Sequence, residues 1–234
     1  FHAGHTDDRM LLDMEMIERM DPETAQHLVS RGVQFASPSF GLNFLLSSKE
    51  DPKRAFQEYL FEEIMPHSEE GTDTSAATRF AVGASLGGHT SLVAFLRKPE
   101  LFQGVATTIG ALLNFNFHSP SELEIYIRDA GLTSDYATEL KRIYFTCFEN
   151  YGLYQSIDPM RLLSETNASV LKNKRILVET GSSDDFGLHL GMSDFSDALT
   201  KKGVAHRYEL VDGGRHEPAF IMSRFSPMLR FLIP

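Results

Sequence analysis

The sequence predicts an α/β fold in which a mostly parallel sheet is flanked by helices. Short runs of β-branched and aromatic residues alternate with longer segments of helical periodicity. No repeat, low-complexity tract or long linker divides the chain, so we expect a single domain over residues 1–234. Because strands that alternate with helices build βαβ units, the sheet should be parallel and covered on both faces.

Five strands and four helices account for this alternation. The predicted strands are Val33–Ser37, Arg79–Gly83, Gly104–Thr108, Arg175–Glu179 and His206–Val211. The predicted helices are Pro22–Arg31, Pro52–Met65, Ser85–Leu96 and Gly191–Lys202. In Pro52–Met65 the apolar residues recur at steps of three and four, which is the period of one helix face.

One interval breaks the alternation. From about residue 111 to residue 163 the pattern is helical, and no convincing strand occurs. We call this segment the excursion. Long insertions between core elements often carry function, so we favour a cap over a functional site, with a plain surface excursion as the alternative.

Composition excludes several classes of protein. Lys and Arg number 22 against 32 Asp and Glu, so the formal net charge is −10, which disfavours a nucleic-acid partner. No apolar run is long enough to span a membrane, so we expect a soluble protein, either cytoplasmic or secreted. Cys147 is the sole cysteine, which excludes a disulfide framework and a cysteine-based zinc site. We predict no metal and no organic cofactor. The oligomeric state is left open.

A serine at a strand-to-helix turn is the strongest local signal. The run Gly83-Ala84-Ser85-Leu86-Gly87 is a G-x-S-x-G sequence between a predicted strand and a predicted helix. Such a turn holds the serine in a strained backbone conformation and leaves no room for side chains beside it. The pattern predicts that Ser85 is a nucleophile and that the Leu86 backbone N–H, at the helix N-terminus, faces developing negative charge.

A serine nucleophile needs a histidine base and a carboxylate that orients it, in the chain order serine, acid, histidine. His216 follows the last predicted strand in a glycine-containing loop, and we predict that it is the base. Asp184, in the loop after the preceding strand, is the favoured acid. Asp185 is the second choice, and Glu179 or Asp212 follows. Adjacent loop acids are most often solvated or cap a helix, but the serine and the histidine require one of these two.

These motifs carry a family resemblance. The stretch from Arg79 to Gly110 resembles the α/β-hydrolase esterases of the esterase D, S-formylglutathione hydrolase and mycolyltransferase group. The loop "GSSDDF" is similar to the acid loop of that group, in which an aspartate stands two residues before a phenylalanine, and this selects Asp184. "GGRHEPAF" resembles its histidine loop. The group usually has a tryptophan after the histidine, and Phe220 would fill that space.

The start of the chain looks like the group's loop that supplies a second oxyanion donor. On this match of Phe1-His2-Ala3-Gly4, the Gly4 backbone N–H would pair with that of Leu86. The match also implies that the first strands of the family's sheet lie upstream, and residues 1–234 alone would then be poorly soluble, because a sheet edge would be unpaired.

The resemblance implies the α/β-hydrolase fold and a serine hydrolase that cleaves small-molecule carboxylic esters through an acyl-enzyme. An acyltransferase with the same triad, a non-catalytic binding protein of this fold and a peptidase are the alternatives. Acyl and alcohol preference cannot be read from the motifs.

Overall fold

Four parallel strands form the centre of the computed structural model, which describes residues 13–41, 43–71, 78–113 and 120–234. The strands are β1 (Phe80–Ala84), β2 (Gly104–Thr108), β3 (Arg175–Gly181) and β4 (Arg207–Val211), hydrogen-bonded in that order. Their carboxyl ends are in register: Ala84 pairs with Thr108, Thr108 with Glu179, and Gly181 with Val211. Loops that follow β1, β3 and β4 therefore emerge at one edge of the sheet.

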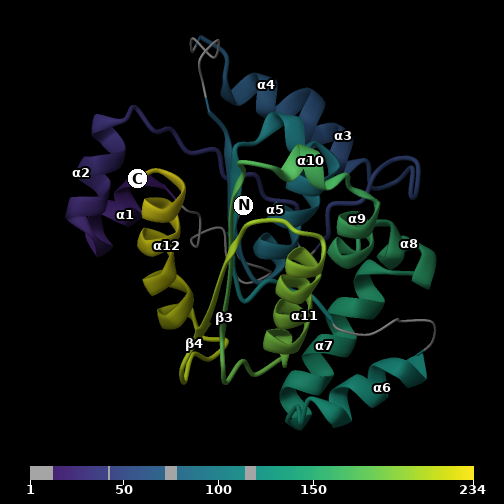
Figure 1. Cartoon of the computed structure of the whole chain (residues 1–234). Helices are drawn as coiled ribbons and strands as arrows, with labels where there is room; N and C mark the ends of the chain where they lie inside the picture. Colours follow the sequence, from purple (N-terminus) through teal and green to yellow (C-terminus); the bar gives the residue numbers. More distant parts are fainter. Residues whose placement is uncertain (1–12, 42, 72–77, 114–119) are drawn as a thin grey trace.

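Helices cover both faces of this sheet (Figure 1). One face packs against α5 (Leu86–Arg97), α9 (Pro159–Glu165) and α11 (Leu188–Lys201). The other face packs against α1 (Met14–Met20), α2 (Pro22–Ser30) and α12 (Pro218–Leu232). Successive residues of β1 alternate between the two cores, because side chains of a strand point to opposite faces. The prediction of a mostly parallel sheet flanked by helices is confirmed.

The prediction that Val33–Ser37 forms a strand is wrong. The segment carries no strand assignment, and a cavity of about 890 Å³ lies between it and the β1 edge, with Val33, Phe35, Phe80 and Val82 among its walls. β1 is an edge strand of the sheet formed by the described residues. A β-branched, aromatic run becomes a strand only where a neighbouring backbone takes up its hydrogen bonds.

The predicted helix Pro52–Met65 begins four residues further along the chain than expected. It starts at α3 (Phe56–Glu58), continues as the π-helical turn η2 (Tyr59–Ile64) and ends in α4 (Met65–Ser68). Residues before it form a turn in which the Arg54 N–H donates to the Asp51 carbonyl at 2.9 Å. The remaining short elements are the 3₁₀ turn η3 (Pro99–Leu101) and α10 (Ala168–Leu171).

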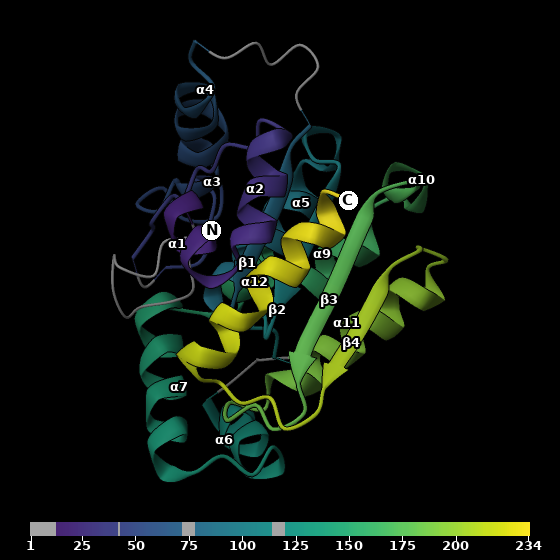
Figure 2. The ribbon, with the colours of Figure 1, turned by 90° about the vertical axis from the view of Figure 1, so that its left-hand side faces the viewer.

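The excursion is helical, as predicted. It contains α6 (Pro120–Asp129), α7 (Ser134–Cys147), α8 (Tyr151–Ser156) and α9. Figure 2 shows α6 beyond the arrowheads of β3 and β4, on the side where the strands end, with α7 running alongside that end. None of the helices in the described ranges is long and apolar enough to cross a membrane.

Candidate active site

Ser85 occupies a strained turn between β1 and α5. Its backbone has φ 52° and ψ −123°, a conformation that non-glycine residues rarely adopt. Hydrogen bonds hold it there: the Ser85 N–H donates to the Thr108 carbonyl at 3.2 Å, and the Ser85 carbonyl accepts from the Ala111 N–H at 2.9 Å. A Cβ at Gly83 would come within 2.2 Å of the Gly87 carbonyl oxygen, so this turn requires a glycine.

Gly88 lets α5 approach the sheet. A Cβ at this position would lie 2.3 Å from the Thr107 hydroxyl oxygen and 3.0 Å from the Gly110 Cα atom. The glycine-rich sequence therefore serves both the turn at Ser85 and the close packing of α5 on β2.

The structure brings the three predicted side chains into one hydrogen-bonded chain. The Ser85 Oγ atom lies 3.0 Å from His216 Nε2, and His216 Nδ1 lies 2.8 Å from Asp184 Oδ2. The three residues follow β1, β3 and β4, whose carboxyl ends share one sheet edge. Residues 131 positions apart, Ser85 and His216, thus meet through the register of the sheet.

Asp184 is fixed by backbone groups as well as by the histidine. Its side chain has no exposed surface. Asp184 Oδ1 accepts the N–H groups of Phe186 and Leu188, each at 3.0 Å, which leaves Oδ2 directed at the imidazole. Leu188 is the first residue of α11, so the carboxylate also supports the start of that helix.

Asp185 is not the solvated carboxylate that its loop position suggested. Its side chain is only 11% exposed and forms an ion pair with Arg215 at 2.6 Å. The other oxygen, Oδ2, accepts the backbone N–H of His216 at 3.0 Å. Asp185 therefore binds the histidine loop through its main chain, while Asp184 contacts the imidazole. The motif that selects Asp184 for the imidazole gives no sign that its neighbour binds the main chain of the histidine loop.

The remaining acid alternatives do not contact His216. Glu179 is fully buried and pairs with both Arg224 Nε and Nη2, at 2.8 and 2.7 Å. This hydrogen-bonded pairing raises the pKa of Arg224 above its ordinary value. Asp212 is exposed and accepts from the Ser182 hydroxyl at 3.5 Å.

The histidine loop packs closely on the turn after β3. A Cβ at Gly214 would lie 2.6 Å from the Phe220 ring and 2.8 Å from the Gly181 Cα atom. Phe220 is half-buried in this position. Its ring fills space behind the loop that carries His216.

Of the two predicted oxyanion donors, one lies within the described residues. Leu86 is the first residue of α5. The N–H groups of the first helical turn have no acceptor within the helix, so the Leu86 N–H can donate to a bound group. Gly4 lies outside the described residues. Among the described residues, no cluster of three or more His, Cys, Asp or Glu side chains could hold a metal ion.

Side chains from the excursion reach the site. A pocket contains Ser85 and His216 and is also lined by Leu140, Ile143 and Tyr144 of α7. The predicted cap therefore contributes side chains beside Ser85. Sequence analysis did not identify these three residues, because apolar positions on an amphipathic helix read as core. Phe44, in an irregular loop, lines the same pocket and had no periodic signal.

Comparison with known proteins places these features in a family. The family model described as "Putative esterase" matches residues 44–232, which is most of the chain. No match was found among the curated proteins.

Solved structures share the fold. FphF, a fluorophosphonate-binding serine hydrolase of Staphylococcus aureus, is 15% identical with a TM-score of 0.63, over 100% of this chain and 81% of its own. MPT51 of Mycobacterium tuberculosis is 12% identical with a TM-score of 0.64, over 99% and 86%. An S-formylglutathione hydrolase of Agrobacterium tumefaciens is 16% identical with a TM-score of 0.59, over 100% and 83%.

The resemblance seen in the motifs is thereby confirmed for the fold and for the family. The parallel sheet, the serine turn and the family match agree along the same stretch of chain. The chain belongs to the family described as putative esterases: it has the α/β-hydrolase fold and is a hydrolase of carboxylic esters.

Proposed function

We propose that Ser85, His216 and Asp184 are the catalytic triad of this esterase. The observation that carries the proposal is the continuous chain of contacts from Ser85 Oγ to His216 Nε2 at 3.0 Å and from His216 Nδ1 to Asp184 Oδ2 at 2.8 Å. An alcohol oxygen becomes nucleophilic when a neighbouring imidazole takes its proton, and a buried carboxylate holds that imidazole in the accepting tautomer.

The first half-reaction acylates the serine. Ser85 Oγ attacks the ester carbonyl carbon while its proton passes to His216 Nε2. The Leu86 N–H at the start of α5 donates to the oxyanion, with the Gly4 N–H proposed as the second donor from the sequence match. His216 then gives the proton to the departing alkoxide oxygen, and the C–O bond to the alcohol breaks.

The second half-reaction releases the acid. Water gives a proton to His216 Nε2 and attacks the acyl carbon, and the proton returns to Ser85 Oγ as the acyl–enzyme bond breaks. The Asp184 carboxylate accepts the Nδ1–H hydrogen bond and stabilises the transient imidazolium. Each cycle consumes one ester and one water, and every proton transfer is carried by this chain's own residues.

Replacement of the nucleophile tests the proposal. Ser85→Ala should lower kcat/KM for a p-nitrophenyl ester on the order of 10⁴- to 10⁶-fold, because the covalent route is lost. The variant should also fail to react with a fluorophosphonate probe, the reagent class that FphF of Staphylococcus aureus binds. Ser164→Ala is the matched control, since this serine is exposed and donates only to the Arg161 carbonyl. A folded Ser85→Ala protein that keeps a tenth of the activity would refute the assignment.

A further inference from the structure

A small cavity lies directly against the proposed nucleophile. It has a volume of about 50 Å³ and touches both Ser85 and His216. Its described apolar walls include Phe44, Leu113, Leu140, Ile143, Phe186 and Leu188. We call it the acyl cavity.

The volume of the acyl cavity limits what can enter it. An apolar cavity of about 150 Å³ accommodates benzene, so one carbon of an apolar ligand takes roughly 25 Å³. On that scale the acyl cavity holds about two carbon atoms. Together with the carbonyl carbon bonded to Ser85, this corresponds to an acyl chain of two or three carbons.

The described walls of the acyl cavity carry no formal charge. Among its described residues there is no Asp, Glu, Lys or Arg. Burial raises the pKa values of the Tyr144 and Tyr154 hydroxyls well above the ordinary value, so both stay neutral. A carboxylate brought into this space would lose its hydration without gaining a partner of opposite charge.

The walls are also braced from behind by interlocked rings. Phe148 packs against Tyr144, Tyr154 and Phe44 with ring centroids 4.9, 5.4 and 4.9 Å apart. Packed aromatic rings of this kind resist the displacement that a larger acyl group would require.

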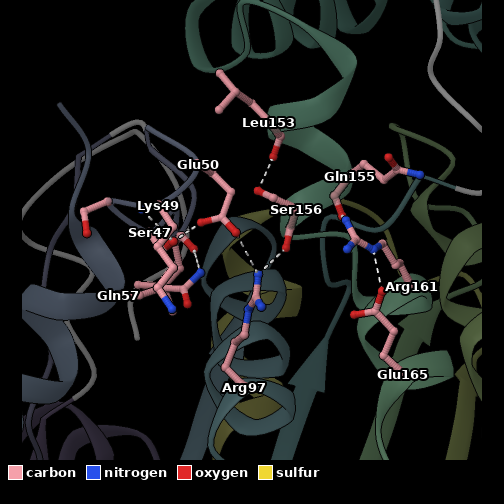
Figure 3. Close-up of polar contacts among 12 residues, drawn as sticks. Ser47, Lys49, Glu50, Gln57, Arg97, Leu153, Gln155, Ser156, Arg161 and Glu165 are labelled. Atoms are coloured by element: carbon pink, nitrogen blue, oxygen red, sulfur yellow. Dashed lines mark hydrogen bonds and ion pairs between the residues drawn. The ribbon is translucent and has the colours of Figure 1, made fainter. Parts of the chain in front are cut away.

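Polar contacts tie these rings to the scaffold. Arg97 of α5 donates to the Ser156 carbonyl at 2.5 Å and pairs with Glu50 at 3.7 Å (Figure 3). This joins α8 and the loop that follows Phe44 to the helix that begins at Leu86. Arg54 donates to the Cys147 carbonyl at the end of α7. These contacts hold α7, α8 and the loop of residues 44–51, which surround the cavity, in place relative to one another.

The acyl side of the ester fits this space better than the alcohol side. The alcohol leaves beside His216 and water must then enter there, so that side needs contact with solvent. The His216 side chain is 13% exposed, which provides it. The acyl group, in contrast, is bonded to the serine from the end of the first half-reaction until the second releases it, and it can occupy a confined space.

We propose that the acyl cavity restricts this esterase to short, uncharged acyl groups of two or three carbons, while the alcohol portion of the ester extends outside it. The proposal rests on Ser85 as the nucleophile, as proposed above. Aromatic acyl groups and long fatty acyl chains exceed the volume of the cavity.

A panel of p-nitrophenyl esters from acetate to decanoate tests this selectivity. kcat/KM should be highest for acetate or propionate and should fall at least about tenfold by hexanoate, since each misfitted methylene costs on the order of tenfold or more. The p-nitrophenyl monoester of succinate should be cleaved at least about tenfold more slowly than the butyrate, which has the same chain length without the charge. A profile that is flat or rises with acyl length overturns the proposal.

Two substitutions test whether the cavity itself sets the limit. Ile143→Ala removes three carbons from a half-buried wall residue and should raise the hexanoate-to-acetate ratio at least about tenfold. Ala111→Val adds two carbons and should lower kcat/KM for propionate more than for acetate. Ile125→Ala is the matched control, because this residue is 47% exposed on α6, and its ratio should not change.

The outcomes separate the two proposals. If no ester is cleaved and Ser85 does not react with a fluorophosphonate, the nucleophile and the acyl cavity are both refuted. If the protein labels and turns over but neither Ile143→Ala nor Ala111→Val changes the acyl profile, only the acyl cavity is refuted.

Discussion

Asp184 and Asp185 are adjacent, yet their carboxylates bind different parts of the same histidine. Asp184 contacts the imidazole at 2.8 Å, and Asp185 accepts the backbone N–H at 3.0 Å. The sequence motif selected Asp184 for the imidazole, and the geometry supports that choice. The role of the second carboxylate depends on how the loops after β3 and β4 meet, which no local pattern contains.

Asp184→Asn should lower kcat by up to about 10⁴-fold while the protein still folds. The amide oxygen can still accept the Phe186 and Leu188 N–H groups, so the start of α11 is retained. The amide NH₂ would face His216 Nδ1 and favour the tautomer that cannot accept the serine proton. Steady-state kinetics together with a thermal melt measure the two effects separately. A loss below about tenfold would contradict the assignment.

Asp185→Ala should lower kcat on the order of 10- to 100-fold with little change in KM. The truncation releases the His216 main chain and the Arg215 side chain, and small displacements of a catalytic group are costly. Asp185→Asn should lose less than about tenfold, because its amide oxygen can still accept the N–H group. Asp212→Ala, an exposed acid in the neighbouring turn, is the control. Equal losses in the Ala and Asn variants would show that the backbone contact is unimportant.

At the scale of elements, a buried ion pair joins β3 to α12. Glu179 has no exposed surface and accepts two hydrogen bonds from Arg224, plus one from the Thr108 hydroxyl of β2 at 2.8 Å. Sequence analysis left Glu179 open as a triad acid because it is an acid at the end of a strand near the site. Its partner lies on a helix that sequence analysis did not predict.

Glu179→Gln should lower the free energy of unfolding by about 3 kcal/mol, since it neutralises the fully buried member of the pair and leaves the half-buried Arg224 guanidinium with a weaker partner. Activity per folded molecule should be unchanged. Glu209→Gln is the control: Glu209 lies 3.5 Å from Arg224 and is more exposed, so its loss should cost less than about 1 kcal/mol. Urea unfolding followed by circular dichroism measures both. Similar values for the two variants would show that burial does not strengthen the Glu179 pair.

At the scale of the whole molecule, the sequence predicted the class of fold and the order of the central elements better than it predicted the elements at the edge of the sheet and at the end of the chain. Strands β1 to β3 were found because buried parallel strands read as compact runs, whereas β4 is mostly accessible and was found from its alternation of polar with aromatic and apolar residues. Val33–Ser37 also contains β-branched and aromatic residues but carries no strand assignment, since pairing depends on a neighbour and not on the run itself. α12 was missed, because its Pro227 weakens the helical signal that its apolar face provides.

The sole cysteine reports on the integrity of the whole fold. Cys147 is 1% exposed, and burial raises the pKa of its thiol to about 11, so the reactive thiolate is scarce below that pH. At pH 8 a disulfide reagent should modify the native protein at least about 100-fold more slowly than the urea-unfolded protein. Following the released chromophore measures the rate. Similar rates in the two states would show that the end of α7 opens without unfolding.

The separation of the triad along the chain has a consequence for folding kinetics. Ser85, Asp184 and His216 meet only when β1 to β4 are paired in register, and such long-range pairing forms late and slowly. Recovery of ester hydrolysis during refolding should therefore lag behind the recovery of helical circular dichroism. A collapsed intermediate whose helices have formed but whose β4 has not yet paired with β3 would hydrolyse no ester. Turnover therefore marks the step in which the last strand joins the sheet.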